Sequence, residues 1–133
     1  MREIKFKALD KEAKRIYDVV GINWDENGEI TTVFVDNADV IEELLPDDIE
    51  LLQYIGLKDK NGKEIYEGNI VNINNEVIAI VTWDENNARY YPKIIKEIKH
   101  YSDYDIRMYR TNIQWEIIGN IYENPELLKE VQP

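Results

Sequence analysis

The sequence contains no cysteine and a single histidine, so several kinds of site are excluded at the outset. Without cysteine there is no disulfide framework, no thiolate metal ligand and no thiol nucleophile. Histidine-based zinc sites normally use more than one histidine, and neither a Gly-x-Ser-x-Gly nor a His-Glu-x-x-His motif occurs. We therefore interpret His100 as a surface residue, and we expect no cofactor, no metal and no enzymatic activity.

Long apolar runs are also missing. No run approaches the roughly 20 residues that a membrane-spanning helix needs. The N-terminus carries charges at Arg2, Glu3, Lys5 and Lys7 and lacks the apolar core of a secretory signal. A chain without cysteine also suits a reducing compartment. We therefore expect a cytoplasmic protein with no membrane partner.

Basic residues are absent from residues 16–57, although the chain has 16 of them elsewhere. The same stretch holds eleven acidic residues, so the whole net charge of −11 arises there, and the remaining chain balances 16 basic against 16 acidic residues. A solvated acidic surface that aids solubility is one interpretation. The other is a face for a basic partner or a mimic of nucleic-acid phosphates. Neither favours DNA binding through counterion release by the chain as a whole.

Strand patterns dominate the remaining sequence, whose 133 residues fit one domain over residues 1–133. Apolar and charged residues alternate over residues 3–8, and β-branched residues fill 16–24 and 30–35. Asn27-Gly28 lies between the last two runs and predicts a β-hairpin. Residues 77–83 are apolar on both faces, which indicates a central strand. Residues 112–122 are again strand-like, and Gly119 marks a bulge or close packing.

Two helices are predicted, one in the acidic stretch and one at the C-terminus. Apolar residues at 40, 41, 44 and 45 have helical spacing, with Asn37 as a possible cap and Pro46 as the stop. Asn124 and Pro125 predict the start of the C-terminal helix. Residues 47–53 fit either a helical turn or a strand, and residues 92–110 fit either a short helix or an irregular strand. Short strands separated by frequent turns indicate a mainly β protein, a barrel or a sandwich.

Three segments together resemble the YopX family of small proteins, encoded largely by phages and prophages of Gram-positive bacteria. They are residues 2–10, residues 53–71 (QYIGLKDKNGKEIYEGNIV) and residues 116–128 (EIIGNIYENPELL), in the family's order and at both ends of the chain. Position 69 is Asn where the family more often has Asp, and position 55 is Ile where Thr is common. The resemblance implies a fold related to small SH3-like barrels, self-association and a bacterial host cell. It implies no reaction.

The segment 56–71 contains glycines at 56, 62 and 68 with lysines nearby, which invites comparison with a phosphate loop. A phosphate cradle opens onto a helix N-terminus, whereas these glycines separate strands. Asp59, Asn61 and Glu67 do not have the spacing of a calcium loop. We therefore interpret the segment as a strand–turn–strand element. The carboxylate pairs Asp47/Asp48 and Asp103/Asp105 are interpreted as exposed loop acids.

Residues 89–110 combine six basic residues with five tyrosines, as single-strand nucleic-acid binders do. The net charge of −11 and three acidic residues in the same stretch argue against this interpretation. The alternative is that the tyrosines pack at strand edges or at a subunit interface. The sequence thus leaves three hypotheses. The first is a non-enzymatic interaction module that forms a homo-oligomer, with 89–110 docked on 16–57 of a neighbour. The second is a weak single-strand binder, and the third is an acidic decoy for a basic or DNA-binding host protein.

Overall fold

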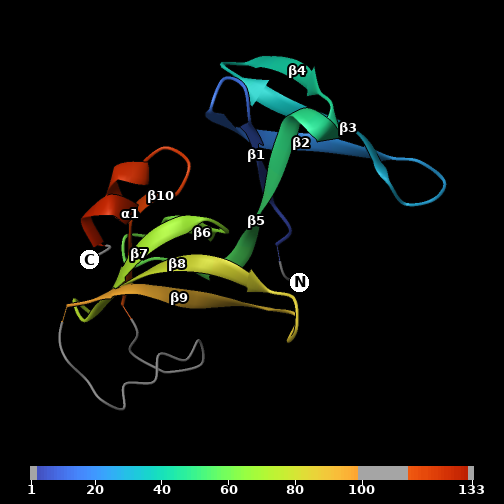
Figure 1. Cartoon of the computed structure of the whole chain (residues 1–133). Helices are drawn as coiled ribbons and strands as arrows, with labels where there is room; N and C mark the ends of the chain where they lie inside the picture. The colour runs from blue at the N-terminus through green and yellow to red at the C-terminus, as the bar shows by residue number, and fades with distance from the viewer. Residues whose placement is uncertain (1–2, 99–113, 132–133) are drawn as a thin grey trace. The chain divides into compact units, whose positions relative to one another are not determined.

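The computed structural model describes residues 3–98 and 114–131, which form ten strands, one short 3-10 helix and one α-helix (Figure 1). The chain divides into two compact units, Met1–Tyr54 and Ile55–Pro133. That residues 1–133 form one domain stays a prediction.

The first unit is an antiparallel sheet in the strand order β4-β3-β2-β1-β5. Its elements are β1 (Phe6–Asp10), β2 (Arg15–Trp24), β3 (Ile30–Asn37), β4 (Val40–Leu44), the 3-10 helix η1 (Pro46–Asp48) and the beginning of β5 (Ile49–Lys58). The predicted first strand and the predicted hairpin around Asn27-Gly28 are confirmed as β1 and β2–β3. Residues 47–53, which fitted either a helical turn or a strand, form the end of η1 and the start of β5.

Alternation along the strands places the apolar core of this unit on one face of the sheet. Ala8, Val33, Val35 and Ile49 are buried there, and half-buried side chains such as Leu44 pack against them. The strand order β4-β3-β2-β1-β5 brings these positions together although they come from distant parts of the sequence.

The helix predicted over residues 38–45 is wrong. Ala38 and Asp39 have φ values of 51° and 69°, the backbone of a two-residue type I′ hairpin turn, and Val40–Leu44 is strand β4. The Asp36 carboxylate accepts a hydrogen bond from the Asp39 N–H at 3.0 Å and stabilises this turn. The expected cap, Asn37, instead donates from its side chain to Glu42 at 3.0 Å.

The second unit contains an antiparallel sheet in the order β10-β7-β8-β9, together with β6 paired to the end of β5. Its elements are β6 (Glu64–Tyr66), β7 (Asn69–Ile73), β8 (Val77–Asp84), β9 (Arg89–Glu97), β10 (Trp115–Asn120) and α1 (Pro125–Val131). The strand–turn–strand interpretation of residues 56–71 is confirmed. Of the ambiguous residues 92–110, positions 92–97 belong to β9, and residues 99–110 lie outside the described residues.

The prediction of a central, doubly apolar strand is confirmed by β8, which lies between β7 and β9. Val77, Ala79 and Val81 are buried on one face, in a core that also contains Trp115 and Ile73. Side chains on the other face of β8 are half-buried, which explains why both faces of this strand are apolar.

The C-terminal predictions also hold, with one change of detail. The pairing of β10 with β7 shifts register between Ile117 and Gly119, so the predicted bulge is present. Helix α1 begins at Pro125 as expected. The Asn124 side chain, however, accepts a hydrogen bond from the Asn120 N–H at 3.2 Å and so secures the turn that precedes the helix.

The protein is therefore mainly β, with two antiparallel sheets and one α-helix among the described residues. Neither sheet closes on itself in the described strands, because each order begins and ends with a different strand. The predicted SH3-like barrel is not confirmed.

Gly68 generates a prediction about stability. Its φ is +88°, and a Cβ there would lie 2.8 Å from Cε2 of Tyr122. Gly62 has φ +81° but nothing within 4 Å of its Cβ position. We expect Gly62→Ala to destabilise the protein by about 1–2 kcal/mol through backbone strain alone. We expect Gly68→Ala to cost at least about 1 kcal/mol more, because Tyr122 must also move.

Urea unfolding monitored by circular dichroism measures both variants. Equal losses in the two variants would contradict the close packing of Tyr122 against Gly68.

Candidate interaction surface

The acidic stretch is an exposed surface. All eleven acidic residues of 16–57 are exposed: Asp18, Asp25, Glu26, Glu29, Asp36, Asp39, Glu42, Glu43, Asp47, Asp48 and Glu50. Of these eleven acids, only Asp18 has a basic partner among the described residues, with its carboxylate 3.9 Å from Nζ of Lys7. The negative charge of the first unit is therefore largely uncompensated within the described chain.

Several aspartates have a structural role in hairpin turns. The Oδ1 atom of Asp25 accepts hydrogen bonds from the N–H groups of Asn27 and Glu29, at 2.8 and 3.0 Å. Asp10 and Asp36 open their turns with the same kind of side-chain to backbone bond. These bonds take the place of water as the acceptors for the turn N–H groups, and they leave the second carboxylate oxygen available on the surface.

The same geometry occurs at Asp84 in the β8–β9 turn. The side-chain amide of Asn87, which donates to Asp84 at 2.8 Å, lowers the pKa of that carboxyl. Backbone N–H groups of Asn86 and Asn87 and the charge of Arg89 act in the same direction, against a desolvation effect. Asp84 is thus held as the anion by its own turn.

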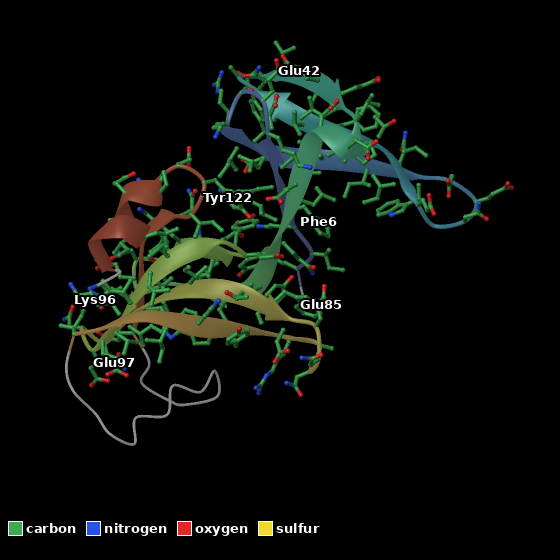
Figure 2. All side chains as sticks on the ribbon, viewed as in Figure 1. Phe6, Glu42, Glu85, Lys96, Glu97 and Tyr122 are labelled. Atoms are coloured by element: carbon green, nitrogen blue, oxygen red, sulfur yellow. The ribbon has the colours of Figure 1, made fainter. Side chains whose placement is uncertain are left out.

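Strand β4 is the outer edge of the first sheet, and it carries exposed apolar side chains beside its acids (Figure 2, where Glu42 is labelled). Val40 and Ile41 are 60% and 58% exposed, and Leu45, just beyond the strand, is 60% exposed. Sequence reasoning missed this surface because it assigned the stretch to a helix. The adjacent β-branched residues Val40 and Ile41 were the available signal for a strand.

Segment 56–71 contains the one buried acidic residue among those described, Asp59, which is 6% exposed. Its Oδ1 accepts the N–H groups of Asn61 and Lys63, both at 2.9 Å. Its Oδ2 accepts the N–H of Ile117 at 3.1 Å, from strand β10 and 58 positions further along the chain. Asp59 therefore ties the β5–β6 turn to the distant strand β10.

These hydrogen bonds also determine the titration of Asp59. Burial acts to raise its pKa, but the N–H groups of Ile117, Lys63 and Asn61 outweigh burial, with the charge of Lys63 in support. The pKa of Asp59 therefore lies below its ordinary value of 3.8. The carboxylate is ionised and fully used as an acceptor by the protein itself.

This arrangement supports the structural interpretation of segment 56–71. Both Asp59 oxygens point to backbone donors of the chain, so they do not face a shared cation position. The strands that follow Gly62 and Gly68 are β6 and β7, and no helix N-terminus opens there in the described chain. No group of acidic and histidine side chains suited to a metal ion occurs within residues 3–98 and 114–131.

The other sequence candidates are placed only in part. Asp47 and Asp48 form part of η1 and are exposed, as the interpretation as loop acids predicts. His100, Asp103 and Asp105 lie outside the described residues.

The basic, tyrosine-rich stretch begins on β9, an edge of the second sheet. Strand alternation places Arg89, Tyr91 and Lys93 on one face, opposite Asp84, Thr82 and Ile80 of β8. Lys93 and Lys96 are exposed, and Tyr91 is half-buried. Figure 2 shows Lys96 and Glu97 at the end of the β8–β9 hairpin opposite to Glu85.

Tyr90 lies on the other face of β9. Its ring meets that of Trp83 edge-on, with the two ring centroids 4.8 Å apart. One of the tyrosines therefore packs against the protein itself on an edge strand, as expected if the tyrosines pack at strand edges.

Comparisons with known proteins agree with this architecture. A family model described as YopX protein matches residues 5–129. The chain belongs to the YopX family. No curated protein matches it.

Two solved structures are similar to this YopX protein over nearly the whole chain. Protein EF1440 from Enterococcus faecalis is 23% identical, with 96% of this chain and 99% of that chain covered and a TM-score of 0.64. Protein yopX from Bacillus subtilis is 20% identical, with 92% and 96% covered and a TM-score of 0.57. These likenesses support the fold. In the part of the chain that the structure describes, no helix has the length and apolarity to cross a membrane.

Asp59 predicts a specific acid sensitivity. Because its pKa is lower in the folded state, its stabilisation is complete above the ordinary value of 3.8 and is lost as the pH falls through the folded value. We expect Asp59→Asn to cost about 1.5–3 kcal/mol at neutral pH, the usual loss for hydrogen bonds to a charged group. The same variant should lose less stability than the wild type on acidification.

Asp25→Asn is the matched control, because Asp25 holds the same kind of turn but is exposed and has no third donor. Its cost should stay within about 0.5 kcal/mol. Urea unfolding between neutral and acidic pH measures both variants. An Asp59→Asn protein with the acid profile of the wild type would contradict the assignment.

Proposed function

We propose that this protein is a phage or prophage accessory protein that works as a non-enzymatic interaction module and as a homo-oligomer. The phage association rests on membership of the YopX family, as the resemblance implies. The interaction role rests on the segregation of charge between exposed surfaces of the two units.

The observation that carries the proposal is the uncompensated acidic surface of residues 16–57. An exposed surface with one sign of charge attracts a partner surface of the opposite sign and accelerates encounter. Strand β9 supplies such a surface on the same chain, with Arg89, Lys93 and Lys96 exposed.

Two copies can satisfy each other's charge through these surfaces. In a two-fold dimer the acidic surface of each copy contacts the basic surface of the other, whereas the same contact made in one direction only gives a closed ring or an open chain. Strand β9 carries the basic patch, and the acidic patch is spread over strands β2 to β5 and the turns and 3-10 helix between them.

A charge-reversal experiment tests this proposal. We expect Lys93→Glu/Lys96→Glu to shift the protein towards the monomer, because it makes the basic surface acidic. Lys14→Glu/Lys58→Glu changes the net charge equally at exposed positions that are not part of β9 and should leave the assembly intact.

Light scattering coupled to size exclusion, at low and high salt, measures the mass of each variant. Assembly of the wild type should weaken as salt rises, because exposed charges are screened. A wild type that is a salt-insensitive monomer at high concentration would contradict the proposal.

A second candidate function is weak binding of single-stranded nucleic acid. It is favoured by the face of β9 on which Tyr91 lies between Arg89 and Lys93, a ring flanked by two cations. Bases stack on such rings while the cations contact phosphates.

For this candidate, Tyr91→Ala should weaken binding of a short single strand about tenfold, whereas Tyr91→Phe keeps the ring and the affinity. Fluorescence anisotropy at low salt measures the affinity. Equal affinity of the wild type and Tyr91→Ala for the single strand would contradict base stacking on Tyr91.

A further inference from the structure

Strand β4 presents a free backbone edge with a defined polarity. In the sheet order β4 is terminal, and β3 is its only partner among the described strands. The type I′ turn at Ala38 and Asp39 closes on a hydrogen-bonded pair, Asn37 and Val40. Since hydrogen-bonded and non-bonded pairs alternate, the N–H and C=O groups of Ile41 and Glu43 point away from β3.

Natural sheets usually protect such an edge, and the protection on β4 is limited to its short length and the charges of Glu42 and Glu43. Lysine, proline and bulges are the frequent devices. β9, the edge of the other sheet, has Pro92, Lys93 and a bulge opposite Ile78/Ala79. β4 has no lysine or proline, and its five pairs with β3 run without a register shift.

The side chains of β4 are also of the kind that a docked strand covers. Val40 and Ile41 point to opposite faces, and both are more than half exposed. Glu42 and Glu43 likewise point to opposite faces and have no basic partner among the described residues. An added strand would therefore meet Val40, Glu42 and Leu44 on one face and Ile41 and Glu43 on the other.

A second copy of β4 does not suit this edge. In an antiparallel pairing of β4 with itself through the free groups of Ile41 and Glu43, the central registers place Glu42 opposite Glu42 or Glu43 opposite Glu43, and like charges directly opposite destabilise a sheet. Pairing with β9 of another copy meets Pro92, which has no N–H to donate. The charges of β4 require a strand that is basic and has free amides.

We propose that β4 captures an extended, basic segment of a different protein by strand addition. The inference rests on the interaction role proposed above, but not on the homo-oligomer. All strand pairs with a known register in this protein are antiparallel, so the bound strand is taken as antiparallel. From its N- to its C-terminus, the bound strand has an apolar residue opposite Leu44, basic residues opposite Glu43 and Glu42, and apolar residues opposite Ile41 and Val40.

A labelled peptide with the core Leu-Lys-Lys-Ile-Val between Gly-Ser flanks tests the proposal by fluorescence anisotropy. We expect saturable binding to the full chain that weakens as salt rises from about 50 to about 500 mM. Glu42→Lys/Glu43→Lys should weaken it by at least about tenfold, because the basic side chains then meet like charge. The matched control is Glu12→Lys/Glu85→Lys, with the same change of charge at exposed turn positions outside residues 16–57, and it should bind as the wild type does.

The backbone hydrogen bonds between β4 and the peptide are tested by changes in the protein and in the peptide. Ile41→Pro removes an N–H that β3 does not use, and it should abolish binding. Independently of any effect on folding, N-methylation of the peptide residues opposite Ile41 and Glu43 should abolish binding, because their amides face β4. N-methylation of the residue opposite Glu42 should not.

Binding that survives both Ile41→Pro and the blocking N-methylation overturns the proposal, as does an equal loss in the two charge variants. Self-assembly that is lost with Ile41→Pro would assign the edge to a second copy and would also overturn it. A further outcome is that the peptide fails to bind while the wild type is an oligomer and the Lys93→Glu/Lys96→Glu variant is a monomer. In that case this inference fails and the proposed function stands.

Discussion

The architecture of the second unit depends on one buried carboxylate. Asp59 takes two hydrogen bonds from its own turn and one from Ile117, so a single side chain fixes the turn and the position of β10. The turn is also held at backbone level, because the Lys60 N–H donates to the carbonyl of Trp115 at 2.8 Å. Without the carboxylate, three backbone donors around a buried position would lose their acceptor, which is costlier than losing a neutral hydrogen bond.

The same chemistry explains much of the acidic composition. Asp10, Asp25, Asp36 and Asp84 each start a hairpin turn by accepting backbone N–H groups. These acids therefore have a local structural role besides their contribution to surface charge. The glutamates of β4 have no such role, and this difference is why they stand out as candidates for contact with another molecule.

The sequence predicted the elements whose signals are local. Alternation located β1, Asn27-Gly28 located the β2–β3 turn, and Pro125 located the start of α1. Local signals failed at residues 38–45, where Ala38 and Asp39 adopt the positive φ angles that sequence rules assign to Asn-Gly. Because the sequence did not indicate a turn at Ala38 and Asp39, the spacing of apolar residues at 40, 41, 44 and 45 predicted a helix.

The candidate surface was predictable only in its charge. The acidic stretch is visible in the sequence, but its free edge depends on β4 being a strand and on its place at the end of the sheet. The burial of Asp59 had no local signal, because its decisive partner, Ile117, is 58 positions away. Sheet closure failed as a prediction for a similar reason, since it depends on pairing between distant strands.

The contact between Gly68 and Tyr122 has a consequence for sequence evolution. The ring occupies the space that a side chain at position 68 would need, with Cε2 2.8 Å from the Cβ position. The two positions are therefore constrained as a pair, although 68 follows β6 and 122 follows β10. In related chains a larger residue at 68 requires a smaller one at 122, whereas a glycine at 68 permits the aromatic ring. A lineage that loses the glycine first passes through a strained protein, so the order in which the two positions change is restricted.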